Sequence, residues 1–169
     1  TYTTATTGST DIQIGNPSDP VRPITTASVG DGKWHHYAIS AIKIGNNLKF
    51  KLYVDGEINQ TVTQSGIGEM PEVKSFICGK IGKDNITVAS PGSFSGSLDD
   101  FKYWKGLRNN REIGRYFDKK VFANDFSNKE YTSRIGLYYN FNKPPIGKTK
   151  KDSLVFDYSG NEITGRIKE

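Results

Sequence analysis

The sequence has one cysteine, no long apolar run and none of the common short motifs of enzymes. Because Cys78 has no second cysteine to pair with, no internal disulfide can form, and the fold of these 169 residues must rest on a hydrophobic core. No apolar stretch approaches the roughly 20 residues of a membrane-spanning helix, so we expect no membrane insertion. The motifs G-x-S-x-G and H-E-x-x-H and the phosphate loop are also missing, which disfavours the enzyme classes that they mark.

The net charge is +5, but the basic residues do not gather in a stretch suited to nucleic acid. Lysines and arginines are scattered at alternate strand positions and in loops, which is typical of a solvated surface. The densest cluster, at residues 148–151, lies in a loop with Pro and Gly and without interleaved aromatics, so it indicates phosphate binding only weakly. We therefore expect no nucleic-acid partner, and a general attraction to anionic glycans stays open.

Residues 31–62 carry the clearest strand pattern. Apolar and polar residues alternate over residues 48–55, which predicts a half-buried strand with Tyr53 on its polar face. Asp55-Gly56 then predicts a tight hairpin turn. The returning strand is predicted to carry three residues in one register, Ile58, Gln60 and Val62.

Other segments predict further strands and one short helix. Residues 34–44 have apolar groups on both faces, which predicts a central strand covered on both sides. In the strand predicted at residues 94–104 the apolar phase slips at Asp99-Asp100, which indicates a bulge. Asn109 is predicted to cap the only helix, whose apolar face consists of Ile113, Tyr116 and Phe117. Strands are also predicted at residues 12–15, 73–81, 135–141 and 154–158, and the rest of residues 1–29 reads as loop.

Several motifs resemble the laminin-G-like, concanavalin-A-like jelly roll. D-G-K-W-H-H-Y-A at residues 31–38, L-Y-V-D-G at 52–56, C-G-K-I-G at 78–82 and F-S-G-S-L-D-D-F-K-Y-W-K-G-L at 94–107 follow the order of the back half of such a domain. I-G-L-Y-Y-N-F-N at 135–142 and V-F-D-Y-S-G-N-E-I-T-G at 155–165 resemble the way such domains begin. The resemblance implies an all-β fold, an antiparallel jelly-roll β-sandwich with one short helix.

The order of these motifs predicts an unusual domain organisation. Residues 1–118 resemble a jelly roll without its opening strands, and residues 119–134 form a connection. Residues 135–169 either open a following jelly roll or fold back to complete the first one as a permuted domain. We expect the first arrangement, in which the chain is part of a larger repeat-containing polypeptide.

The resemblance also implies a calcium site, because jelly rolls of this superfamily often bind calcium at the edge of the sandwich. Asp99 matches the acidic position of the late G-x-L-D strand, and Asp100 and Asp157 are further candidate ligands. Calcium takes six to eight oxygen ligands, so backbone carbonyls must contribute as well. The alternative is that Asp99 and Asp100 bond backbone amides in the bulge, while Asp157 caps the turn that follows it.

Catalysis is not expected. The superfamily includes laminarin-degrading glycosidases, but their E-x-D-x-E arrangement is absent, and Glu57, Glu69 and Glu72 lie in a turn and a proline-containing loop. His35 and His36 are adjacent on a predicted strand and point to opposite faces, so they cannot readily share a metal ion. We expect both to pack or to form hydrogen bonds.

These observations favour a non-catalytic recognition or adhesion module on an extracellular, cell-surface or virion-surface protein. Its expected partner is a glycan or surface glycoprotein, for which sugar-stacking aromatics and polar loop residues are needed. The alternatives are a spacer or assembly domain that contacts neighbouring subunits, and a degenerate glycosidase fragment. The candidate ligand-binding residues are Asn46, Asn47, Asp84, Asn85 and Trp104, with Tyr2 and Tyr138 as further aromatic platforms.

Overall fold

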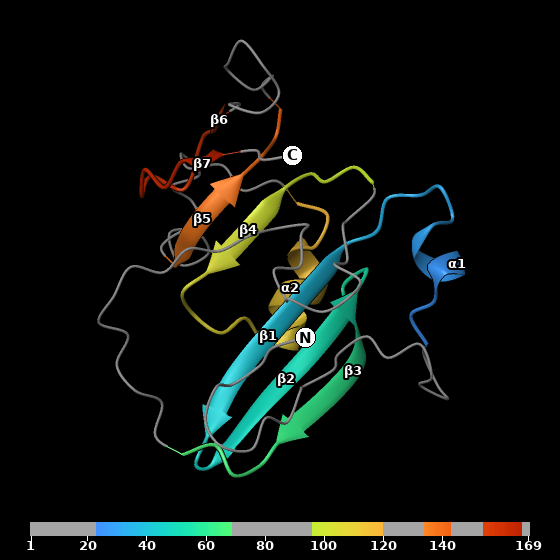
Figure 1. The fold of residues 1–169 in the computed structure, drawn as a ribbon, viewed down its shortest axis with the longest axis vertical. Coiled ribbons are helices and arrows are strands. Elements are labelled where there is room, and N and C mark those ends of the chain that lie inside the picture. Colours follow the sequence, from blue (N-terminus) through green and yellow to red (C-terminus); the bar gives the residue numbers. More distant parts are fainter. Residues whose placement is uncertain (1–22, 69–95, 120–133, 143–153, 167–169) are drawn as a thin grey trace, which may run out of the picture. The chain divides into compact units, whose positions relative to one another are not determined.

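The computed structural model describes residues 23–68, 96–119, 134–142 and 154–166, whose elements are labelled in Figure 1. The chain divides into two compact units. The first unit holds residues 1–70 and 104–134, and the second holds residues 71–103 and 135–169. Strands and antiparallel pairs predominate in the described residues, in agreement with the predicted all-β class. The strands predicted at 12–15 and 73–81, and the basic cluster at 148–151, lie outside the described residues.

The described sheet of the first unit has three antiparallel strands in the order β1-β2-β3. These are β1 (Tyr37–Ile44), β2 (Asn47–Val54) and β3 (Glu57–Gln64). Asp55 and Gly56 connect β2 to β3 with φ angles of 50° and 84°. A two-residue hairpin that follows the right-handed strand twist needs positive φ at both positions, so the predicted turn is confirmed.

A β-bulge in the β2–β3 pair changes which side chains share a face. Leu52 pairs with Gln60, whereas Tyr53 pairs with Ile58, so Asn59 is the extra residue. One extra residue reverses the alternation of a strand, and Ile58 therefore shares the face of Tyr53 while Gln60 shares the face of Leu52. The prediction that Ile58 and Gln60 lie in one register is wrong for this reason.

Tyr53 is the most deeply buried large side chain among the described residues, with 1% of its surface exposed. The alternating pattern placed Tyr53 on the polar face of the strand and so predicted that its side chain is exposed. The difference arises because helix α2 (Asn110–Tyr116) lies against this sheet, as Figure 1 shows, and its first residue accepts a hydrogen bond from the Tyr53 hydroxyl at 2.7 Å. A segment distant in sequence therefore covers a strand face that alternation alone assigns to solvent.

The prediction that strand β1 is covered on both faces is wrong, because three of its apolar side chains are exposed. Within the described residues its only strand neighbour is β2. Tyr37, Ile39 and Ile44 are exposed, and the strand begins at Tyr37, later than predicted. Apolar residues on both faces of a strand therefore do not require that both faces are covered.

Helix α2 confirms the predicted short helix and its cap. The Asn109 side chain accepts a hydrogen bond from the Glu112 amide at 3.0 Å, and the Glu112 carboxylate accepts one from the Asn109 amide at 2.8 Å. This reciprocal capping box satisfies two N–H groups that the helix itself leaves without partners. Beyond the helix, the Phe117 ring lies 5.8 Å from the His36 ring, between centroids. This ring contact joins the end of the helix to the segment before β1.

A second, one-turn helix, α1 (Thr26–Val29), lies in a segment predicted to be loop. The Ser28 hydroxyl donates to the Thr25 carbonyl and accepts from the Thr25 amide, both at 2.9 Å. Serine and threonine side chains compete locally for backbone groups, so their abundance predicts turns and short helical turns equally well. The pattern therefore could not separate the two.

The second unit contains two small sheets within its described residues. β4 (Phe101–Trp104), which reaches the boundary of the unit, pairs with β5 (Ile135–Tyr139), and β6 (Leu154–Val155) pairs with β7 (Gly165–Arg166). Ile135, Tyr138 and Tyr139 are the buried apolar residues here. β4 lies in the segment that resembles the back half of a jelly roll, and β5 lies in the segment that resembles the opening of one. The β4–β5 pair therefore joins these two segments. Whether residues 135–169 complete one domain or open another stays a prediction.

Within the strand predicted at residues 94–104, the described residues 96–100 are not in a strand, and β4 begins at Phe101. Asp100 has a φ of 53°, a left-handed conformation that does not continue a strand. The slip in apolar phase that indicated a bulge therefore marks the beginning of β4.

Candidate functional site

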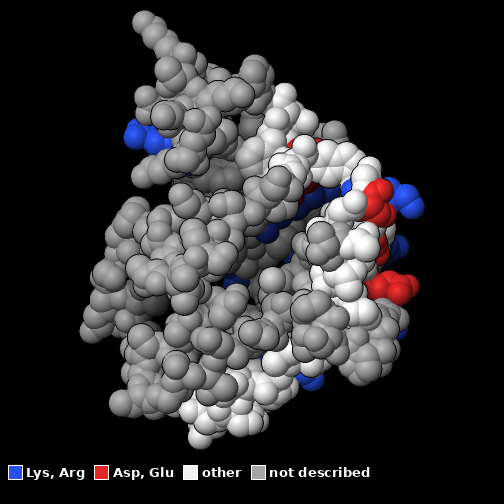
Figure 2. All heavy atoms as spheres, turned by 45° about the vertical axis from the view of Figure 1, so that its right-hand side comes forward, with Lys and Arg blue, Asp and Glu red and all other residues white. Residues whose placement is uncertain are grey.

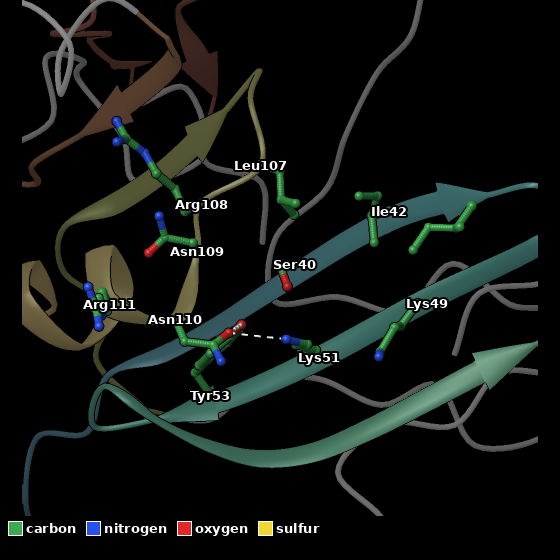
Figure 3. Close-up of a pocket in the computed structure, with 11 residues that line it drawn as sticks. Ser40, Ile42, Lys49, Lys51, Tyr53, Leu107, Arg108, Asn109, Asn110 and Arg111 are labelled. Carbon is green, nitrogen blue, oxygen red and sulfur yellow. Dashed lines mark hydrogen bonds between the residues drawn. The ribbon is translucent and has the colours of Figure 1, made fainter.

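An open cleft of about 510 Å³ lies between one face of the β1–β2 pair and the segment that leads into α2 (Figure 3). Residues 107–111 line one side. The sheet side is lined by Ser40, Ile42, Ile44, Lys49, Lys51 and Tyr53. All of these residues belong to the first compact unit.

The strand register explains why these sheet residues share one face. Ser40 pairs with Lys51, and Ile42 pairs with Lys49. Side chains of directly paired residues lie on the same side of an antiparallel sheet. Residues that are two positions apart in one strand also share a side. The alternation of β2 thus places its lysines in the cleft.

Asn110 organises the end of the cleft where the helix begins. Its Oδ1 atom accepts a hydrogen bond from the Tyr53 hydroxyl at 2.7 Å and another from Lys51 Nζ at 3.1 Å, the contact drawn in Figure 3. These two hydrogen bonds connect the buried Tyr53 and the more accessible Lys51, both on β2, to the same side-chain amide. The position of the Lys51 ammonium group is thereby fixed by a neutral acceptor.

Arg108 occupies the adjacent corner of the cleft and covers Trp104. The guanidinium carbon lies 3.9 Å from the centre of the Trp104 ring, a cation–π contact, and Nη1 lies 3.3 Å from Oε1 of Glu112. Trp104, predicted as a sugar-stacking platform, therefore has Arg108 on one ring face. Of the other aromatic candidates, Tyr138 is 4% exposed and Tyr2 lies outside the described residues.

The cleft differs in charge from the surface around it. Figure 2 shows Lys and Arg side chains close to Asp and Glu side chains on the described surface, so both signs are mixed there. The described residues that line the cleft include four cations, Lys49, Lys51, Arg108 and Arg111, and no carboxylate. The described lining is therefore basic, although the net charge of the chain is only +5.

The loop residues predicted to bind a glycan are not among the described residues of the cleft. Asn46 and Asn47 are exposed at the β1–β2 turn, where the Asn46 carbonyl accepts a hydrogen bond from the Ile67 amide at 2.9 Å. Asp84 and Asn85 lie outside the described residues. The sequence contained a usable signal in the alternating lysines of residues 49 and 51, but their partners at residues 107–111 are joined to them only by the fold.

Asp157 holds together the turn that follows it. Its Oδ1 accepts hydrogen bonds from the amides of Tyr138 and Ser159, and its Oδ2 accepts from the Ser159 hydroxyl and the Ile163 amide. Burial alone would raise the pKa of Asp157, but these hydrogen bonds outweigh it and hold the pKa below the ordinary value. The side chain thus has the capping role that was the alternative to calcium binding.

Asp99 and Asp100 also have hydrogen-bond partners. Asp99 Oδ1 accepts from the Asp100 amide at 3.0 Å, and Asp100 Oδ1 accepts from the Tyr138 hydroxyl at 2.7 Å. Within the described residues no three His, Cys, Asp or Glu side chains gather as a metal site would require. This search does not count the backbone carbonyls that the predicted site requires, so the calcium site stays a prediction.

His35 lies between two carboxylates. Its Nδ1 is 2.8 Å from Asp55 Oδ2 and its Nε2 is 3.1 Å from Asp31 Oδ1. The hydrogen bonds to Asp55 and then to Asp31 raise the pKa of His35, because they favour the imidazolium that donates at both nitrogens. The residue ties the segment before β1 to the β2–β3 turn, a structural role of the kind predicted for it.

Comparison with known proteins identifies the family of the chain. A family model described as the concanavalin A-like lectin/glucanases superfamily matches residues 2–114, about two thirds of the chain. The matched range includes every described residue that lines the cleft. No curated protein and no solved structure matches significantly. In the described residues, no helix has the length and apolar character needed to cross a membrane.

Proposed function

We propose, from the premise that this chain belongs to the concanavalin A-like lectin/glucanases superfamily, that it is a non-catalytic module that recognises carbohydrate. The partner is a glycan or a surface glycoprotein, met outside the cell or at a virion surface. Family membership gives the fold class, a β-sandwich, and the function is argued from the cleft, because this fold serves many functions.

The composition of the cleft is the observation that carries the proposal. Ligand sites are typically concave, with volumes of about 300–1,000 Å³, and combine apolar walls with a few polar groups. The cleft of about 510 Å³ has both, since Ile42 and Leu107 offer apolar surface while Ser40 and Asn110 offer hydroxyl and amide groups. A sugar needs this combination, because its ring faces are apolar and its edges carry hydroxyls.

The same lining supports binding without hydrolysis. Glycosidases of the usual kinds need two carboxyl groups on either side of the scissile bond, one as acid and one as base or nucleophile. The described residues that line the cleft include neither aspartate nor glutamate. A sugar placed there would be held and not cleaved.

A glycan array with two matched variants tests the proposal. Ser40→Phe places a ring in the cleft, whereas Ala41→Phe places the same ring on the other face of β1, where Ala41 is exposed. We expect specific array signals that persist in Ala41→Phe and disappear in Ser40→Phe. An array without signals, or signals that both variants retain, contradicts carbohydrate recognition at this cleft.

A second candidate function is assembly with neighbouring subunits. It is favoured by the exposed apolar side chains of strand β1, of which Ile39 is 61% exposed. An exposed apolar strand of this kind is suited to protein contact. Concentration-dependent association that Ile39→Lys abolishes, together with an empty glycan array, would favour this candidate over the first.

A further inference from the structure

The four cations of the cleft raise the question of which charge balances them. Within the described residues, Lys49, Lys51 and Arg111 form no ion pair, whereas Arg108 is paired with Glu112. Like charges near one another cost energy that an anion can recover, above all in a concave site where the field is focused. The cleft therefore has three cations available to an incoming anion.

The contact of Lys51 shows how an anion would be received. Its Nζ donates a hydrogen bond to a neutral amide oxygen, Oδ1 of Asn110, at 3.1 Å. An ammonium group has three N–H donors, so this bond orients Lys51 and leaves further donors for a ligand. Hydrogen bonds from a cation to an ionised oxygen are roughly twice as strong as those to a neutral one, so an anionic oxygen is the preferred additional partner.

The aromatic content of the lining distinguishes saccharides from single-stranded nucleic acids. Proteins that bind single strands combine cations with exposed aromatic rings on which bases stack. Tyr53, the only aromatic side chain among the described lining residues, is 1% exposed and hydrogen-bonded to Asn110. The accessible apolar surface of the described lining is aliphatic, from Ile42, Ile44 and Leu107.

We infer that the ligand of this cleft is an acidic saccharide, whose carboxylate or sulfate groups are bound by the cations Lys49, Lys51 and Arg111. The inference rests on the proposed carbohydrate recognition and specifies its ligand class. Binding to the cations neutralises their mutual repulsion, while the aliphatic walls contact the sugar ring. Because both anionic groups offer the same chemistry to lysine and arginine, the experiment includes one ligand of each kind.

Isothermal titration with three oligosaccharides of similar length tests the inference: a polyuronate, a sulfated glycan and a neutral glycan. We expect the wild-type chain to bind at least one acidic oligosaccharide roughly tenfold or more tightly than the neutral one, with affinity that falls as salt rises. The double variant Lys49→Gln/Arg111→Gln should lose about tenfold or more of that affinity. A single-stranded oligonucleotide of equal charge should bind more weakly than the acidic saccharide.

A second double variant provides the control. Lys43 lies on the opposite face of β1, where it donates to the Gly68 carbonyl, and Arg115 lies on α2 outside the cleft lining. Lys43→Gln/Arg115→Gln removes the same charge, so a loss as large as in the cleft variant would overturn the inference by indicating general attraction. Equal binding of neutral and acidic glycans overturns the ligand class but leaves carbohydrate recognition intact. Stronger binding of the oligonucleotide also overturns the inference, and binding of no glycan removes the proposed function itself.

Discussion

Replacement of Gly56 by alanine should destabilise the chain and disturb the cleft. Gly56 has a φ of 84°, and a Cβ added there would lie 2.7 Å from Cδ1 of Phe117 and 3.1 Å from Cα of Gly114. The Gly114 contact is to the backbone of α2, which cannot move without a shift of the helix. Since α2 begins with residues that line the cleft, the turn and the cleft are mechanically connected.

The expected magnitude has two parts. A left-handed conformation costs a residue with a Cβ about 1–2 kcal/mol. Overpacking against the helix adds about 1–3 kcal/mol, for a total of roughly 2–5 kcal/mol. Gly45→Ala is the matched control, because Gly45 also has positive φ, 57°, but an added Cβ there would meet no atom within 4 Å. It should cost only the first part.

Urea unfolding of the two variants and the wild type measures both parts. The free energy of unfolding should fall more in Gly56→Ala than in Gly45→Ala, by about 1–3 kcal/mol. Ligand affinity should also fall in Gly56→Ala alone. Equal destabilisation of the two variants would refute the packing of α2 on the β2–β3 turn.

Three further predictions concern other described residues. The pKa of His35 is raised in the folded chain, so the stability from its hydrogen bonds is fully present below pH of about 6.5 and is lost as pH rises through the folded pKa. The melting temperature should therefore fall from pH 6 to pH 8 more in the wild type than in His35→Gln. Parallel curves for the two proteins would refute this. Asp157→Asn replaces one acceptor oxygen of the turn by a donor and should lower the free energy of unfolding by roughly 2–4 kcal/mol in urea titration, whereas an unchanged midpoint would contradict the role of the turn. If calcium binds as predicted, it should raise the melting temperature and Asp99→Asn should remove the rise, while identical melting with calcium and with chelator counts against the site.

The features that the sequence predicted correctly depend on neighbouring residues. The Asp55-Gly56 hairpin follows from the positive φ that its turn type needs, and the Asn109 cap needs only Glu112 three residues later. The hydrogen bonds of Asp157 to its own turn are similarly local. Such features can be predicted from a short window because the backbone conformations and hydrogen bonds that define them lie within it.

The features that the sequence could not predict depend on distant segments. Tyr53 is buried because Asn110, 57 positions away, covers its face. The bulge at Asn59 changed the faces of β3 although the apolar pattern gave no sign of it. The cleft itself joins Lys51 to residues 107–111, and neither segment carries a recognisable binding motif.

The central claim, that an acidic saccharide binds in this cleft, is tested most directly by amide NMR spectra recorded while an acidic oligosaccharide is added. The account predicts shifts concentrated at Ser40, Lys51 and Asn110, with little change at Ser28 in α1, which is not part of the cleft lining. Saturating shifts that map elsewhere, or spectra that do not change while the neutral glycan causes shifts, would contradict it.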